Sequence, residues 1–180
     1  VLCVGFSGQV KDNLAAATLM VVSIALTWMT FRLDAGANKR LFPTGVMSAF
    51  SPVGAAYLAM FLLSASHGIA LMYIPLALQV LYGLSPLWVG VLFTIFSLAW
   101  TTGALTVASW EGKRSHQAMF WGMVLVAVTM AAIGQSIGET SIWYLLFLMT
   151  LFGIGIGLAN VHMIAWSMSA AKRGEEAVTA

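Results

Sequence analysis

Two histidines within long apolar runs are the residues of this sequence best suited to proton chemistry. His67 and His162 lie in runs that contain no Asp, Glu, Lys or Arg. An imidazole gains or loses a proton between about pH 5 and 8, so either ring can exchange protons near neutrality. The alternative for each histidine is a hydrogen bond to a neighbouring helix. If the protein exchanges protons but uses neither ring, another group outside this sequence must do so.

Two amide side chains also interrupt the apolar runs, those of Gln79 and Asn160. Gln79 follows Pro75 by one helical turn, and a proline cannot donate the backbone hydrogen bond that the carbonyl of Leu71 would accept. An amide beside such a break can line a cavity, or it can cap the end of the helix. Pro75 is predicted to kink the helix and can serve as a hinge. Asn160 and His162 are two positions apart, about 200° around a helix, so they face different sides.

Glycines and three aromatic residues add candidate contact positions. Gly153 and Gly157 form a Gly-x-x-x-Gly pair, with Gly155 between them. Small residues at this spacing let membrane helices approach closely, so we predict close packing on the face that Asn160 shares with Gly153. A nucleotide-binding glycine loop is excluded because no strand precedes these residues. Trp100, Tyr57 and Trp121 can stack on a hydrophobic cation, although lipid-facing or packing roles are more common.

The sequence carries no pattern typical of an enzyme or a metal site. Cys3 is the only cysteine, and His67, His116 and His162 have no carboxylate or cysteine at ligand spacing. We therefore expect no catalytic residues, no metal and no cofactor. A net charge of +2 without a basic run gives no indication of nucleic-acid binding.

The composition indicates that lipid, and not water, surrounds most of the chain. Of its 180 residues, 61% are hydrophobic and 8% are charged, whereas soluble domains average about 45–50% apolar and about 25% charged residues. A helix needs about 20 apolar residues to cross the hydrocarbon of a bilayer. We predict an all-α membrane protein with five transmembrane helices, at residues 14–31, 52–81, 86–109, 117–133 and 141–168.

Polar residues mark the ends of these helices. Asp12 or Asn13 is a plausible N-cap for the first helix, and Ser85 with Pro86 is a typical helix start. Gly83 is predicted to stop the second helix. Residues 1–13 are interpreted as the end of a preceding span or as an extracellular loop. Residues 32–51 form a linker that contains a candidate interfacial helix at 41–50. Residues 110–116 form a loop, and residues 169–180 form a tail.

The cations fall on one side of the predicted membrane. If the five helices alternate in direction, seven of the eight Lys and Arg residues share one side, and Lys11 alone lies on the other. The seven are Arg32, Lys39, Arg40, Lys113, Arg114, Lys172 and Arg173. Loops rich in Lys and Arg stay in the cytoplasm, so the linker, the 110–116 loop and the tail are predicted to be cytoplasmic.

The centre of the sequence resembles a known transporter family. The pattern consists of Tyr73, Pro75, Gln79, Gly83, Ser85, Pro86 and Gly90 at fixed spacing. It is similar to the major facilitator superfamily, especially its fourteen-helix drug–proton antiporter branch, in which a helix with proline and glutamine ends at a Gly-x-Ser-Pro turn. The loop residues Gly112, Lys113 and Arg114 resemble a degraded copy of the basic loop of that superfamily, without its Asp-Arg opening. The run from Gly153 to Gly157 resembles a glycine-rich late helix.

The resemblance implies a fold, an activity and partners. This chain would supply about helices eight to twelve of a major facilitator bundle, and both of its ends look cut. The implied activity is proton-coupled efflux of small drug-like or metabolite compounds, by an integral protein of the plasma or inner membrane. Its partners would be lipid, protons, a small substrate and the remaining helices of the full-length chain. The alternative interpretation is a membrane scaffold, or a subunit of a larger complex, that does not itself transport.

Overall fold

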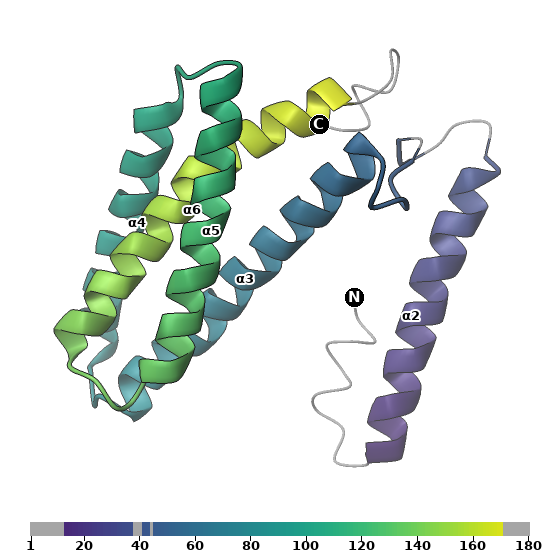
Figure 1. Ribbon diagram of the computed structural model, residues 1–180. Coiled ribbons are helices and arrows are strands. Elements are labelled where there is room, and N and C mark those ends of the chain that lie inside the picture. The colour runs from purple at the N-terminus through teal and green to yellow at the C-terminus, as the bar shows by residue number, and fades with distance from the viewer. Residues whose placement is uncertain (1–12, 38–40, 44, 171–180) are drawn as a thin grey trace.

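The computed structural model describes residues 13–37, 41–43 and 45–170, which form five helices and contain no strand (Figure 1). The helices are α2 (Asn13–Ala35), α3 (Pro52–Val80), α4 (Pro86–Val107), α5 (Lys113–Ser136) and α6 (Ile142–Ala170). All five are long and apolar enough to cross a membrane, as expected of a multi-pass membrane protein. The predicted all-α class is therefore confirmed for the described residues.

Serine and proline start two of the helices, and the start at Ser85 and Pro86 is the one predicted from the sequence. The backbone N–H of Gly54 donates to the Ser51 hydroxyl over 2.9 Å, and Pro52 occupies the first helical position of α3. Ser85 is the N-cap of α4 and is likewise followed by proline. Between these helices, Gly83 has φ +64°, a conformation that is costly for a residue with a side chain. The short turn from α3 to α4 therefore depends on a glycine.

Hydropathy located the helix centres but not all of the helix ends. Helix α5 begins at Lys113 and not at residue 117, so the 110–116 loop is shorter than predicted. Its first turn is polar yet helical, because charged side chains at a helix end reach water without breaking the helix. Helix α2 likewise continues past Arg32 to Ala35. Residues 1–12 of the predicted 1–13 segment and residues 171–180 of the predicted 169–180 tail lie outside the described residues, and so does Asp12, one of the two proposed N-caps.

The candidate interfacial helix at 41–50 is not formed. The described residues of this segment, 41–43 and 45–50, adopt turns and bends. Gly45 has φ +91°, which is not helical, and the Ser51 hydroxyl hydrogen-bonds to the carbonyl oxygens of Gly45 and Ser48. Side-chain bonds of this kind compete with helical ones. The α2–α3 linker is therefore a folded turn structure.

Helix α6 is the centre of the bundle. It lies between α4 and α5 and crosses α3, whereas α2 stands apart from the other four helices (Figure 1). Its side chains Leu145, Met149, Phe152 and Met163 are fully buried. By contrast, large apolar side chains on the outer helices, such as Met72 and Leu105, are exposed. Exposed apolar surface of this extent suits contact with lipid or with further helices.

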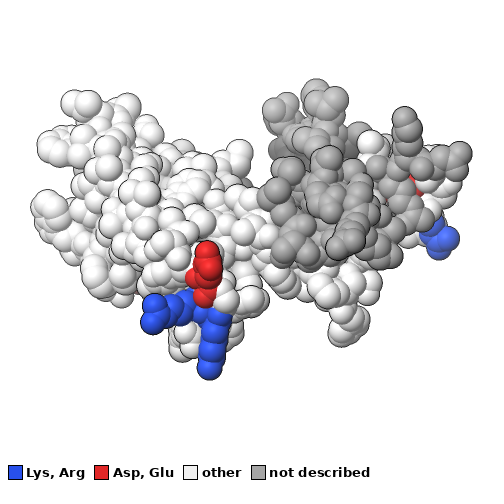
Figure 2. Space-filling model, turned by 90° about the horizontal axis from the view of Figure 1, so that it is seen from above, with Lys and Arg blue, Asp and Glu red and all other residues white. Residues whose placement is uncertain are grey.

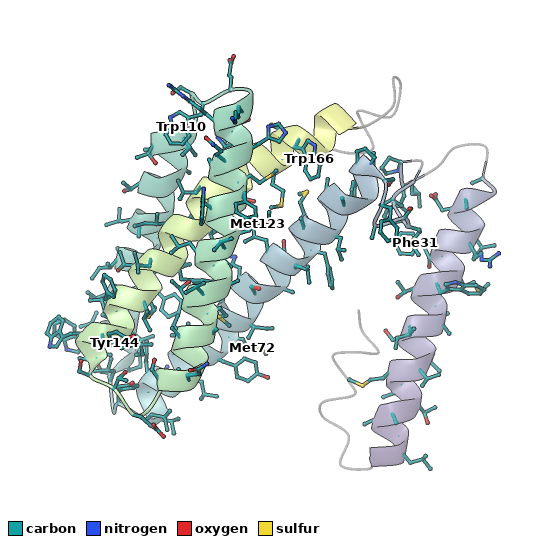
Figure 3. The ribbon with its side chains drawn as sticks, viewed as in Figure 1. Phe31, Met72, Trp110, Met123, Tyr144 and Trp166 are labelled. Carbon is teal, nitrogen blue, oxygen red and sulfur yellow. The ribbon has the colours of Figure 1, made fainter. Side chains whose placement is uncertain are left out.

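Successive helices run in opposite directions, so three connections lie at one end of the bundle. That end carries the α2–α3 linker, the α4–α5 loop and the end of α6, and the described cations Arg32, Lys113 and Arg114 belong to it (Figure 1). Viewed onto this end, the charged side chains form two small separate groups on an otherwise uncharged described surface (Figure 2). Trp110 and Trp166 lie toward the same end and Tyr144 toward the other (Figure 3), where interfacial aromatic residues are expected.

Candidate functional site: a histidine–aromatic cluster between α3 and α4

The ring of His67 lies against two aromatic rings of the next helix. Its centroid is 5.1 Å from that of Trp100, edge to face, and 5.9 Å from that of Phe96. Trp100 and Phe96 are one turn apart on α4, and Phe96 in turn stacks on Phe152 of α6 at 5.9 Å. His67 is half-buried. The His67–Trp100–Phe96 cluster therefore sits where α3 and α4 meet above the core of α6.

Glycines of α6 fix the position of this cluster. A Cβ atom added at Gly153 would lie 2.7 Å from the backbone oxygen of Phe96, and one added at Gly157 would lie 2.2 Å from that of Trp100. Gly103 of α4 approaches Ile154 of α6 equally closely. No side chain fits at these positions, so the two backbones touch, as Gly-x-x-x-Gly pairs allow. The third glycine, Gly155, instead approaches Gly122 and Val126 of α5.

Small and polar residues flank the cluster on α4. Gly90, Thr94, Ser97 and Thr101 are all exposed, and their spacing of four, three and four residues places them on one face. The three hydroxyls donate to backbone carbonyls one turn earlier at 2.9 Å each. A Cβ atom at Gly90 would meet nothing within 4 Å. This face of α4 is therefore smooth and slightly polar, with open space beside it.

Helix α3 presents a matching face. Ser64, Gly68 and Gln79 are exposed, and they share one side of α3 with the half-buried Pro75. Helical register turns this side of α3 by about 90° from His67, whose ring contacts α4. The exposed polar residues of these two faces, together with His67 and Trp100, are what we call the α3–α4 flank. Its hydroxyl, amide, imidazole and indole groups can hydrogen-bond or stack on a small molecule.

The other predicted residues are not gathered at this cluster. Gln79 is exposed in the last turn of α3, and Asn160 is half-buried on α6. His162 is 8% exposed, and its Nε2 atom has no hydrogen-bond partner among the described residues. Gln79 and His162 belong to opposite ends of the bundle. Of the predicted residues, His67 and Trp100 are therefore in contact, whereas Gln79, Asn160 and His162 lie apart from this cluster.

The residues of the predicted basic loop motif, Gly112, Lys113 and Arg114, form the start of helix α5. Gly112 is the N-cap of α5 with φ +56°, and its carbonyl oxygen accepts the Ser115 hydroxyl at 2.8 Å. The Nδ1 atom of His116 lies 2.9 Å from the same oxygen. Lys113 and Arg114 are exposed in the first turn. Within the described part of the chain, no three His, Cys, Asp or Glu side chains gather as a metal site would require.

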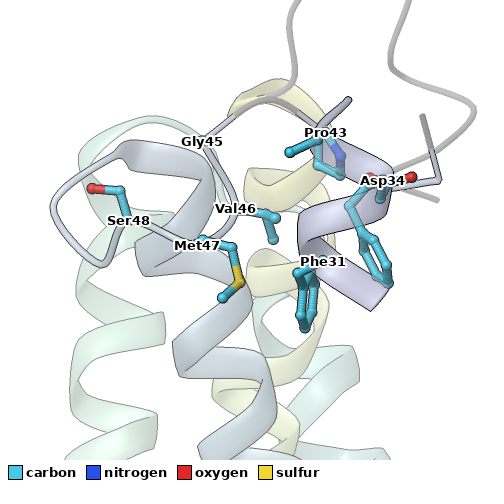
Figure 4. Close-up of a pocket in the computed structure, with 9 residues that line it drawn as sticks. Phe31, Asp34, Pro43, Gly45, Val46, Met47 and Ser48 are labelled. Carbon is cyan, nitrogen blue, oxygen red and sulfur yellow. The ribbon is translucent and has the colours of Figure 1, made fainter. Parts of the chain in front are cut away.

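Sequence reasoning missed a buried carboxylate at the end of α2. Asp34 is 8% exposed and accepts hydrogen bonds from the backbone N–H groups of Leu41 and Phe42. The ring of Phe42 packs on Phe31 with centroids 4.6 Å apart. Phe31 and Asp34 also line a cavity of about 320 Å³ with linker residues such as Val46 (Figure 4). The sequence offered one signal, an acidic residue at a helix C-terminus, where the helix dipole disfavours it unless other groups compensate.

A second missed contact joins the turns at the opposite end of the bundle. The backbone N–H of Gly138, in the α5–α6 turn, donates to the Tyr82 hydroxyl of the α3–α4 turn over 3.0 Å. Gly138 has φ +88°. The two residues are 56 positions apart, so no local pattern could reveal the pair.

No known protein family, curated protein or solved structure matches this chain, so its fold and sites rest on the geometry described above.

Proposed function

We propose that this chain is part of a secondary active transporter, which exports small drug-like or metabolite compounds in exchange for protons by alternating access. The observation that carries the proposal is the contact of His67 with Trp100 within the α3–α4 flank. An ionisable side chain within a membrane span is costly, and it commonly marks a substrate or ion pathway. The sequence resemblance to drug–proton antiporters supports the same activity.

The depth of the cluster suits a transport site. His67 is the sixteenth of the 29 residues of α3, so it lies near the middle of a helix long enough to span the bilayer. Secondary transporters bind their substrates near the bilayer midplane, between helices whose irregular or polar segments face a cavity. Pro75 and Gln79 lie on the same side of α3 as this flank. A substrate would contact aromatic rings and hydroxyl or amide groups.

The packing of the helices suits a rocking motion. The glycines of α6 hold α4 and α5 against it through direct backbone contact, so these three helices form a stiff unit. Helix α3 crosses α6 and also touches α4 and α5, and α2 stands apart. Alternating access requires rigid groups of helices that move against one another around a fixed site. The contact between α3 and α4 is the place in this chain where such motion would open or close the flank.

Transport by the full-length protein tests the proposal directly. Proteoliposomes with an imposed pH gradient should accumulate at least one compound from a panel of hydrophobic and cationic molecules. A proton ionophore should abolish the accumulation, and empty liposomes should show none. A non-transporting scaffold would give no gradient-dependent flux for any compound, and that result would contradict the proposal.

The cluster gives a sharper test within the same assay. His67→Ala removes the ring that contacts Trp100, whereas His116→Ala removes a histidine that is exposed at the start of α5. We expect the first variant to lose most of the transport and the second to keep it. Equal transport by both variants would show that the transport site does not include His67 or the α3–α4 flank.

A further inference from the structure

A carboxylate lies in the wall of a cavity where α2 meets the α2–α3 linker. The cavity has a volume of about 320 Å³, and Phe31, Asp34, Val46 and Met47 are among the residues that line it (Figure 4). Asp34 is 8% exposed, and each of its carboxylate oxygens accepts one backbone N–H. Because a carboxylate oxygen can accept about two hydrogen bonds, each oxygen has capacity for a further donor. The cavity therefore has one anionic wall among mainly apolar ones.

The electrostatics at this end of the cavity favour a cation. Asp34 belongs to the last turn of α2, where the helix dipole places a partial negative charge. Arg32, in the same turn, lies over the ring of Trp28 at 4.7 Å from its centroid, and no ion pair joins it to Asp34. Lys39 and Arg40 lie outside the described residues. Among the described groups, the carboxylate thus has backbone hydrogen-bond donors but no cation.

A second cavity continues from the first one along the membrane span. Its volume is about 310 Å³, and it shares Phe31, Val46 and Met47 with the first cavity. It follows α3 as far as Phe61, which is about 14 Å along the helix from its start. Tyr57 carries the only hydroxyl among its described lining side chains, and none of them is charged. The two cavities together therefore pass from an anionic end to an apolar end.

The position of these cavities suits a lipid. Asp34 is the penultimate residue of α2, a helix long enough to cross a membrane, so it lies at the level of the lipid headgroups. Helix α2 stands apart from the other four helices, so a lipid can enter between α2 and α3 from the bilayer (Figure 1). A lipid places a polar headgroup at the membrane surface and apolar chains below it. The two cavities present their anionic and apolar ends in the same order.

We propose that these cavities bind a membrane phospholipid with a primary ammonium headgroup, with the ammonium at Asp34 and an acyl chain in the second cavity. A primary ammonium carries three N–H donors and a positive charge, so it can use the remaining acceptor capacity of the carboxylate. A choline headgroup carries the same positive charge but has no N–H group, so it lacks these hydrogen bonds. The bound lipid would connect α2 to α3. The proposal does not depend on transport by this protein.

Photo-crosslinking of the full-length protein in bilayers tests the proposal. The probe is phosphatidylethanolamine with a diazirine in one acyl chain, and phosphatidylcholine with the same chain is the headgroup control. Mass spectrometry of peptides should find the ethanolamine probe on residues 54–61 about tenfold more often than the choline probe, as one hydrogen bond between charged groups would give. Labelling of this segment by the two probes within about twofold of each other would overturn the proposal.

Competition distinguishes a lipid from a soluble amine. An excess of unlabelled phosphatidylethanolamine should remove the labelling of residues 54–61, and free ethanolamine should leave it unchanged. Loss of labelling with free ethanolamine would assign the site to a soluble amine and overturn the lipid proposal. Neither measurement requires transport, so a protein that moves no compound contradicts the proposed function and leaves this test intact.

Two pairs of variants separate the headgroup end from the chain end. Asp34→Asn removes the charge and should lower labelling by the ethanolamine probe to the level of the choline probe, whereas Glu111→Gln should not change it. Leu58→Trp fills the second cavity and should lower labelling by both probes, whereas Leu71→Trp changes an equally exposed leucine farther along α3 and should not. An intact ethanolamine preference in Asp34→Asn, or unchanged labelling in Leu58→Trp, would contradict the proposal. If Asp34→Asn does not fold, the two probes on wild type and the leucine pair decide.

Discussion

A Cβ atom at Gly157 of α6 would lie 2.2 Å from the backbone oxygen of Trp100 on α4. The ring centroid of the same tryptophan lies 5.1 Å from that of His67. One backbone contact therefore sets the distance between α6 and α4, and through Trp100 it positions the histidine of α3. The candidate site depends on a glycine that does not itself face the α3–α4 flank.

Replacing this glycine by alanine should loosen the bundle. Gly157→Ala forces α4 and α6 apart, and overpacking of this kind costs about 1–3 kcal/mol. Gly90→Ala is the matched control, because its Cβ atom meets nothing within 4 Å and alanine favours helix by about 1 kcal/mol. Thermal unfolding in detergent should show a lower midpoint for Gly157→Ala and an equal or higher one for Gly90→Ala. Equal midpoints for both variants would contradict the close contact.

Loss of the Asp34 carboxylate should release the α2–α3 linker. Asn in place of Asp offers one acceptor oxygen to the two backbone N–H groups of Leu41 and Phe42, and it removes the charge. Hydrogen bonds to a charged group contribute about 1.5–3 kcal/mol. Amide hydrogen exchange at Leu41 and Phe42 should accelerate about tenfold in Asp34→Asn. Glu111→Gln, which changes an exposed carboxylate, should leave these amides unaffected.

Removal of the Tyr82 hydroxyl should uncouple the two turns at the opposite end. Tyr82→Phe keeps the ring but loses the acceptor of the Gly138 N–H. A neutral hydrogen bond contributes about 0.5–1.5 kcal/mol, so exchange of the Gly138 amide should rise several-fold. Tyr73→Phe alters an exposed tyrosine and is the control. Unchanged exchange at Gly138 in Tyr82→Phe would show that the turns are not joined in the membrane.

Substitution of Trp100 should affect the same activity as His67. Trp100→Phe keeps an aromatic ring but shortens its reach toward His67, whereas Trp110→Phe changes an exposed tryptophan near the membrane surface. We expect Trp100→Phe to raise the substrate concentration for half-maximal transport about tenfold, and Trp110→Phe to leave it unchanged. The measurement is initial transport rate against substrate concentration. Equal values for both variants would contradict a binding role for the cluster.

Single cysteines test which end of the bundle faces the cytoplasm. Glu111 and Glu139 are both exposed, in the α4–α5 loop and the α5–α6 turn respectively. In a chain from which Cys3 has been removed, a maleimide that cannot cross the bilayer should label Glu139→Cys from outside intact cells. It should label Glu111→Cys only after the cells are opened. Labelling of both positions from outside would refute the predicted orientation.

The sequence by itself determined the number of helices and the starts of two of them. Runs of about 20 apolar residues without charge leave helix as the structure that satisfies every backbone group in lipid. Ser51, Ser85 and their following prolines set helix starts through bonds within a few residues of chain. The Gly153–Gly157 spacing likewise indicated a contact face, because small residues at that interval line one side of a helix. These features are local, so a single sequence contains them.

Only the tertiary structure decided which polar groups meet. The contact of His67 with Trp100, the bond from Gly138 to Tyr82 and the isolation of the His162 Nε2 atom join or separate residues on different helices. Helical periodicity gives the direction of each side chain around its own axis, but it gives neither the crossing of two axes nor their distance. Those follow from the glycines that let α6 touch α4 and α5, and the packing of whole faces fixes them.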